Sequence, residues 1–416
     1  MNNTSKSKKI FYFYFLWHGV FLSLTMSMID FNTVFPSLVD SLTSHKIIFG
    51  LLYSIMLGAP LLFNAVFSHY MKRYKYKKKF LLMGIYLRAL SFLGMAVFVY
   101  YFSEKNPNIV VISFFFFILL FSISGGFAGL SYSELIGKLF QSKDRGTLYS
   151  SKQLVGSTAA FIGGLIVNRV FSLESFSYPM NYVFLLSIGF IGLIIASLGF
   201  WFVNEPPSIV VEKEEDTLMN YLKEIPVLLK QDLNFLNFIL VENIASFSLM
   251  ILPFYMVFAR DFFNLDQSYI GRYLLFQISG TVFSNFLWAY LSRRFGSKSV
   301  VNVCILTGSL IPISALLLSR IGPDAYSFVF LLVGFVISGR RIGFDTYLLD
   351  IAPESKRTVY LGVRGTLNVL VVILPIMGSI FIDTLGYNFT FLLVSTVMVL
   401  GFYLFVFRSK SKSNLN

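Results

Sequence analysis

Several charged side chains stand inside apolar segments, where a charge requires a partner or a function. Glu242, beside Asn243, falls about nine residues into such a segment, or about 14 Å deep at 1.5 Å per residue. A carboxylate there is costly to keep ionised unless it is paired, which suits a proton carrier or a binder of cationic groups. The alternative is a buried partner of an arginine that only stabilises the bundle.

Arg340 and Arg341 stand midway along another apolar segment. Adjacent residues on a helix point about 100° apart, so at most one of them faces a cavity directly. A guanidinium in a cavity binds carboxylate or phosphate through two parallel hydrogen bonds. The alternative is an ion pair with Asp345 or with Glu242.

Arg88 and Asp30 are the next candidates for contact with a substrate or a proton. Arg88 lies in the third apolar segment, and Asp30 lies in the outer half of the first. Burial of either charged side chain in the membrane without a partner costs free energy.

Two further sets of charges lie where apolar segments meet polar loops. Arg145 and Lys152 repeat as Arg357 and Arg364 with the same spacing of seven, which favours a symmetric gating part over a substrate ligand. We interpret both sets as ion-pair networks that hold an inner gate shut. Their members are Glu134, Lys138, Arg145 and Lys152 in the first set and Asp345, Asp350, Arg357 and Arg364 in the second.

The segments that position these residues are long and apolar. The chain is 56% hydrophobic and 13% charged, whereas soluble proteins carry about a quarter charged residues. Each span needs about 20 apolar residues, and runs of that length are typical of helices, not of the alternating strands of a membrane barrel. The sequence predicts an all-α polytopic membrane protein, with spans near 11–39, 47–70, 80–102, 109–137, 148–170, 181–203, 233–259, 268–292, 298–319, 325–350, 358–382 and 388–407.

The net charge of +13 follows the topology and does not indicate nucleic acid. Most lysines and arginines fall in loops on one side of the predicted spans, and basic loops stay in the cytoplasm. We therefore expect both termini to be cytoplasmic and the protein to lie in the cell (inner) membrane. The basic N-terminus does not read as a cleaved signal, because the apolar run after Lys9 is too long.

The second half of the chain repeats the first. Gly50 meets Gly271 at an offset of about 221, the offset that also relates two basic loops. We predict an N-terminal bundle over 1–203 and a C-terminal bundle over 233–416. The segment 204–232 between them reads as a cytoplasmic linker with an amphipathic helix near 217–230.

The two basic loops carry a resemblance to a known family. Lys72 and Arg73 follow the second span, and Arg293 and Arg294 follow the eighth. Together with the loops 141–146 and 350–357, they resemble the loop motifs of major facilitator superfamily permeases. The loops depart from the family pattern, because Phe67 or Ala289 replaces its leading glycine and Met71 or Ser292 replaces its aspartate.

The resemblance implies twelve transmembrane helices in two pseudo-symmetric six-helix bundles around a central cavity, working by alternating access. No phosphate-binding loop, zinc-binding helix or nucleophile elbow is present. The sequence therefore predicts a protein that is not an enzyme and that has no cofactor and no metal. We expect a monomeric secondary active transporter of a small solute, with protons as a candidate coupling ion for symport. The alternatives are a lipid or lysolipid flippase of the same fold and a sensor or scaffold without transport.

Overall fold

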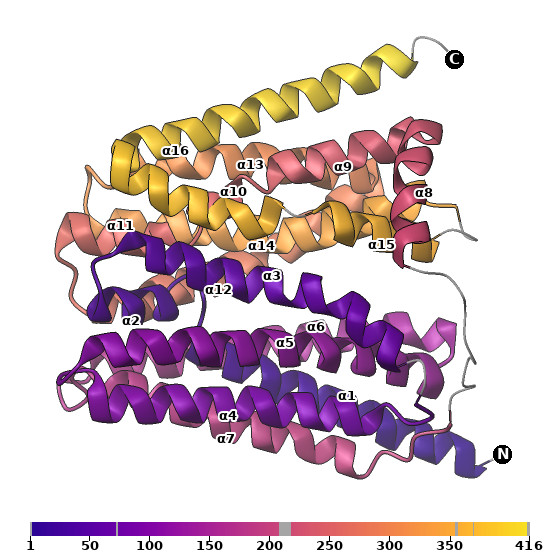
Figure 1. Cartoon of the computed structure of the whole chain (residues 1–416), viewed down its shortest axis with the longest axis horizontal. Helices are drawn as coiled ribbons and strands as arrows, with labels where there is room; N and C mark the ends of the chain where they lie inside the picture. The colour runs from indigo at the N-terminus through magenta and orange to yellow at the C-terminus, as the bar shows by residue number, and fades with distance from the viewer. Residues whose placement is uncertain (1, 72–73, 208–217, 354–356, 369, 414–416) are drawn as a thin grey trace. The chain divides into compact units, whose positions relative to one another are not determined.

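The structure is a computed structural model that describes residues 2–71, 74–207, 218–353, 357–368 and 370–413. Those residues form helices joined by short turns, with no β-strand among them (Figure 1). Eleven helical stretches in these ranges, two of which combine several helices, are long and apolar enough to cross a bilayer. The last of them, Val359–Tyr403, is interrupted at Gly386, which has a φ of 80°, so it covers two predicted spans. The prediction of an all-α polytopic membrane protein is confirmed.

The helices of the first half run up to residue 201 (Figure 1). They are α1 (Asn2–Met28), α2 (Val34–Leu42), α3 (Lys46–Met71), α4 (Lys78–Phe102), α5 (Pro107–Leu139), α6 (Ser142–Ser172) and α7 (Met180–Trp201). In this group α4 packs on α5 and α7, and α1 packs on α6 and α7.

The second half begins after the loop that follows α7. Its helices are α8 (Leu218–Gln231), α9 (Leu233–Ala245), α10 (Ser248–Ile251), α11 (Phe254–Phe263), α12 (Ser268–Phe295), α13 (Ser297–Leu318), α14 (Pro323–Ile351), α15 (Arg357–Leu367) and α16 (Leu370–Ser413). Here α13 packs on α14 and α16, and α16 also packs on α9 and α10. A helix therefore occupies the linker stretch for which an amphipathic helix was predicted.

The long helices are apolar on every face, as α5 illustrates. Phe114, Ile118 and Phe121 recur at helical spacing and are buried, whereas Ile112 and Phe116 on other faces are 69% and 62% exposed. A helix that is apolar all round suits a lipid environment, because lipid replaces the core on the outward face. This pattern positions α5 in a bilayer with its inner face against α4.

The chain divides into two compact units that differ from the predicted halves in two short segments. Unit 1 contains residues 1–44, 55–213 and 266–275, and unit 2 contains 45–54, 214–265 and 276–416. The exchanged segments hold the repeat-related glycines. A Cβ on Gly50 would lie 2.6 Å from the Pro375 carbonyl oxygen, and one on Gly271 would overlap the Asn168 backbone. Both positions therefore require glycine for close backbone approach.

Three predicted spans differ from the observed helices. The eleventh, 358–382, is divided, because α15 ends at Leu367 and α16 begins at Leu370. The first span was expected to reach residue 39, but α1 ends at Met28 and a separate short helix, α2, follows. The seventh span is not continuous, because it breaks into α9, α10 and α11 between Ala245 and Phe254, around Pro253.

Candidate functional site

Arg364 joins two carboxylates in unit 2. Its Nε lies 2.9 Å from both carboxylate oxygens of Glu242, and its Nη2 lies 2.5 Å from one of them. Its Nη1 donates to Asp345 at 2.7 Å. The Glu242 side chain is 4% exposed and the Asp345 side chain 56% exposed, so one arginine links a buried carboxylate to an accessible one. Arg364, and neither Arg340 nor Arg341, forms the ion pairs with Glu242 and Asp345.

Glu242 lies in the last turn of α9, immediately before the helix breaks. A helix end leaves carbonyl oxygens without partners inside the helix. Arg340 from α14 supplies a donor there, because its Nη1 lies 2.6 Å from the Ala245 carbonyl oxygen and its Nη2 lies 3.0 Å from Ser246 Oγ. Arg340 therefore caps the broken helix beside Glu242.

The other two candidates from this region lie differently. The Asn243 side-chain amide donates to the Ile239 carbonyl at 2.9 Å, and its oxygen is buried without a partner in the described part of the chain. Arg341 is exposed and forms no ion pair within the described ranges. Of the two adjacent arginines, only Arg340 contacts this broken helix.

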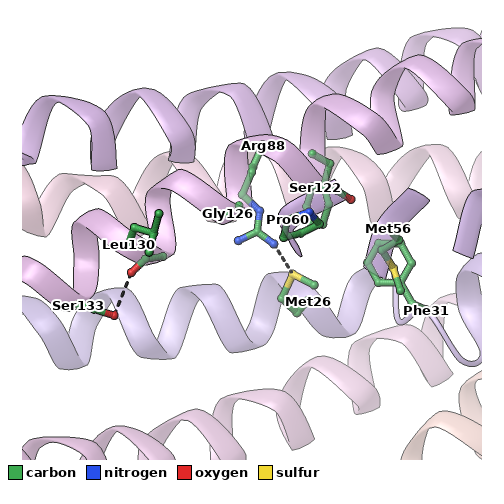
Figure 2. Close-up of a pocket in the computed structure, with 12 residues that line it drawn as sticks. Met26, Phe31, Met56, Pro60, Arg88, Ser122, Gly126, Leu130 and Ser133 are labelled. Atoms are coloured by element: carbon green, nitrogen blue, oxygen red, sulfur yellow. Dashed lines mark hydrogen bonds between the residues drawn. The ribbon is translucent and has the colours of Figure 1, made fainter. Parts of the chain in front are cut away.

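Arg88 belongs to unit 1, where it lines a pocket. The pocket has a volume of about 600 Å³ and lies among α1, α3, α4 and α5. Figure 2 shows the guanidinium beside Met26, with Pro60, Ser122 and Gly126 nearby. Its Nη2 lies 3.9 Å from the Met26 sulfur, and its Cζ lies 4.1 Å from the centre of the Phe121 ring.

Asp30 contributes to local structure. Its carboxylate accepts hydrogen bonds from the Asn32 backbone N–H and the Thr33 hydroxyl, both at 2.9 Å. This arrangement shapes the turn between α1 and α2. It explains why the first helix ends earlier than the hydropathy predicted.

The first predicted gating set is only partly brought together. Glu134 lies 3.9 Å from the Lys138 ammonium and 3.8 Å from that of Lys77. Arg145 instead donates to the carbonyls of Phe140 and Gly137 at the end of α5.

The remaining gating candidates lie apart from one another. Lys152 lies over the Tyr132 ring at 4.1 Å, and Asp350 accepts from the Ser297 hydroxyl. Of the second predicted set, only Asp345 and Arg364 are seen paired. The Arg357 side chain lies outside the residues that the structure describes.

The basic loop motif is described only in its second copy. Arg293 donates to the Ala289 carbonyl at 3.2 Å, and Arg294 donates to the Tyr290 hydroxyl at 2.5 Å. Lys72 and Arg73 lie outside the described residues.

Sequence reasoning missed a cluster around Glu205 at the end of unit 1. The Glu205 carboxylate accepts from the backbone N–H groups of Lys77 and Lys78 at 2.7–2.9 Å and pairs with the Lys138 ammonium. It therefore caps the first turn of α4. The Lys77 side chain is 2% exposed, and burial is the main cause that lowers its pKa below the ordinary value. Its ammonium donates to the carbonyls of Met71 and Tyr74.

No group of His, Cys, Asp and Glu side chains suited to hold a metal ion occurs among the described residues. The geometry offers charged and hydrogen-bonding side chains inside apolar helix bundles. Side chains of these types have the chemistry to bind polar solutes or protons.

Comparison with known proteins identifies the fold. The family model of the Major Facilitator Superfamily matches residues 16–374, and no curated protein matches the chain. A mutant of the nucleoside transporter NupG has a TM-score of 0.71 and 14% identity, covering 95% of this chain and 99% of that one. A POT family transporter in complex with a thioalcohol-conjugated peptide has a TM-score of 0.70 and 11% identity, covering 98% and 96%. A D-xylose–proton symporter has a TM-score of 0.67 and 12% identity, covering 96% and 95%.

At such low identities these structures show a shared fold alone. The family model, however, covers most of the chain, including the helices that hold Arg88 and Glu242. The chain is an integral membrane protein and a secondary transporter that belongs to the Major Facilitator Superfamily.

Proposed function

We propose that this chain is a symporter that moves a small solute by alternating access and couples the movement to protons through Glu242. The observation that carries the proposal is the shared arginine. Arg364 binds the buried Glu242 and the accessible Asp345 at the same time.

The position of Glu242 beside a helix break supports a coupling role. Secondary transporters build substrate and coupling-ion sites from discontinuous helices, whose free ends supply polar groups inside the membrane. Glu242 lies in the last turn of α9, and only the short helix α10 lies between α9 and the start of α11 at Phe254. A carboxylate placed there is close to backbone that leaves the regular helix.

Protonation changes what Arg364 binds. Ionised Glu242 holds the guanidinium through two oxygens. When a proton neutralises the carboxylate, the charge attraction ends, and among the described residues Asp345 is then the ionised partner of Arg364. One proton therefore converts a buried ion pair into a neutral carboxyl and an arginine bound to a solvent-accessible carboxylate, which favours a different conformation.

The test separates coupling from movement. The solute is first found by thermal-shift screening of water-soluble compounds and lysolipids against the purified protein, since ligands stabilise the folded state. In proteoliposomes, Glu242→Gln is expected to lose uptake driven by a pH gradient but to keep counterflow exchange. Glu104→Gln is the matched control, because it makes the same change at an exposed carboxylate in the turn that follows α4, and we expect it to keep gradient-driven uptake.

Three results would contradict the proposal. Gradient-driven accumulation by Glu242→Gln at the wild-type level would exclude Glu242 as the coupling residue. Movement of labelled lysolipid alone would favour a flippase, and no exchange by any variant would favour a sensor or scaffold.

We also propose the cell (inner) membrane as the location, with both termini cytoplasmic and a monomer as the working unit. The orientation is supported by the basic loops, since positive charge near spans remains in the cytoplasm. Labelling of single cysteines placed at residues 46 and 320, after Cys304→Ser, is expected from outside the cell alone.

A further inference from the structure

The pocket around Arg88 contains a guanidinium that pairs with no carboxylate of the described residues. Arg88 forms no ion pair with any carboxylate that the structure describes, and its buried Nε has no hydrogen-bond partner among those residues. Among the described residues, its guanidinium contacts a thioether and an aromatic ring. A cation at membrane depth is costly unless it is paired, so a guanidinium in this setting indicates a partner that comes from outside the chain.

A second unpaired polar group lines the same pocket. The hydroxyl of Ser122 is buried and has no partner in the described part of the chain. Guanidinium N–H groups and hydroxyls both donate hydrogen bonds, and oxyanions accept several at once. The two orphan groups therefore match one ligand chemistry.

Glycines on α5 leave the space that a ligand would need. A Cβ on Gly125 would lie 3.4 Å from both Cζ and Nε of Arg88, so glycine there leaves the guanidinium uncovered. A Cβ on Gly129, one turn further along, would meet nothing within 4 Å. The pocket is thus open along this face of α5, and its volume falls in the range of sites for small organic ligands.

The rest of the lining is apolar. Met26, Phe31, Met56 and Pro60 contribute thioether, aromatic and aliphatic surface. An inorganic ion would leave this surface without a counterpart, whereas an organic anion covers it and gains from its burial. Methionines also adapt to ligands of different shape.

We propose that Arg88 binds the oxyanion of a small amphipathic organic acid, whose apolar part lies against Met26, Phe31 and Met56. The inference rests on the proposed transport function and assigns its substrate class. Carboxylate and phosphate share the required chemistry, and the test below distinguishes them.

The experiment measures binding by the purified full-length protein with isothermal calorimetry. The probes are acetate, hexanoate and phenylacetate, with phenyl phosphate, inorganic phosphate and lysophosphatidic acid as phosphate counterparts. Phenylacetamide is the neutral match for phenylacetate. We expect hexanoate or phenylacetate to bind more tightly than acetate, because they cover the apolar wall, and phenylacetamide to bind at least 10-fold more weakly than phenylacetate.

Variants locate the site. Arg88→Gln is expected to weaken binding of the organic acid about 10- to 100-fold, the range expected when a hydrogen-bonded charge is lost. Gly129→Leu places a side chain in open space and is expected to block binding while the protein stays folded. Arg293→Gln removes a guanidinium that is exposed in α12 and serves as the matched control.

A stability measurement separates binding from a packing role. If Arg88 only packed on Phe121, Arg88→Gln would lower the melting temperature of the ligand-free protein. We expect that temperature to stay the same or to rise, because the substitution removes an unpaired buried charge.

The outcomes distinguish this inference from the proposed function. Equal affinity of wild type and Arg88→Gln, or of the acid and its amide, would overturn the anion site. Binding by the phosphate probes alone would replace the carboxylic acid with a phosphate ester or a lysolipid. Binding that depends on Arg88 without any transport would leave the site standing and refute the proposed function.

Discussion

The shared arginine of unit 2 predicts two very unequal couplings. Replacing Arg364 with methionine leaves Glu242 buried without its partner, whereas Asp345 remains solvated. Two unit charges 4 Å apart attract by about 4 kcal/mol at an effective dielectric constant of 20 and by about 1 kcal/mol in water. Measured exposed pairs contribute about 0.2–1 kcal/mol, and breaking a buried pair costs about 3–5 kcal/mol.

These magnitudes are tested with two double-mutant cycles. One cycle combines Arg364→Met with Glu242→Gln, and the other combines it with Asp345→Asn. The free energy of unfolding is measured in mixed micelles by titration of a denaturing detergent, followed by tryptophan fluorescence. We expect a coupling energy of about 2–4 kcal/mol for Glu242 and below about 1 kcal/mol for Asp345.

Two results would refute the reasoning. Equal coupling energies in both cycles would mean that the exposed fractions of the two carboxylates do not control the strength of their pairing. A loss below about 1 kcal/mol for Arg364→Met alone would mean that Glu242 is stable without it.

Two further predictions concern close packing and helix capping, with the free energy of unfolding as the measurement in both. Gly334→Ala should destabilise the protein, because the added Cβ would overlap the Gln277 backbone. Gly365→Ala is the control and should be neutral or stabilising by up to about 1 kcal/mol, since nothing lies within 4 Å of its Cβ position. Equal effects of the two substitutions would contradict the close helix contact at Gly334. Glu205→Ala should lower the free energy of unfolding by about 1–3 kcal/mol, because it removes the α4 cap and the ion pair with Lys138. Glu205→Gln keeps one accepting oxygen and should lower it by less. Identical losses of stability for the two variants would exclude capping by Glu205.

The membrane fold was predictable because lipid imposes one requirement on every span. Each helix must be apolar over about 20 residues, so hydropathy finds it without knowledge of its neighbours. Hydropathy did not predict the end of α1, because Phe31, Val34 and Phe35 continue the apolar run beyond it. The signal that ends the helix is Asp30 followed by Asn32 and Thr33, which is a matter of hydrogen bonding and not of hydropathy.

The candidate site was predictable in its residue types but not in its pairings. Glu242 was a candidate because it is a carboxylate among apolar residues, yet its partner lies 122 positions away along the chain. Arg340, Arg341 and Arg364 were equally available by charge, and only the packing of α9, α14 and α15 selects among them. The sequence contains no measure of that packing.

The pocket at Arg88 was beyond sequence reasoning for a related reason. Its lining residues come mainly from four helices, and its volume depends on how these helices pack. One trace was present in the sequence, since Gly125 and Gly129 are four residues apart and share a helix face. Glycines so placed are typical of close helix packing in membranes, and the structure shows that this pair instead borders an open pocket.

The capping of α4 by Glu205 also has a mechanical consequence. Glu205 lies just beyond α7, and its carboxylate accepts hydrogen bonds from the backbone N–H groups at the start of α4. Arg88 lies eleven residues beyond Lys77, or about 16 Å along the same rigid helix. We therefore expect a displacement of Glu205 to shift the first turn of α4 and, because α4 is one continuous helix, to shift the Arg88 guanidinium with it.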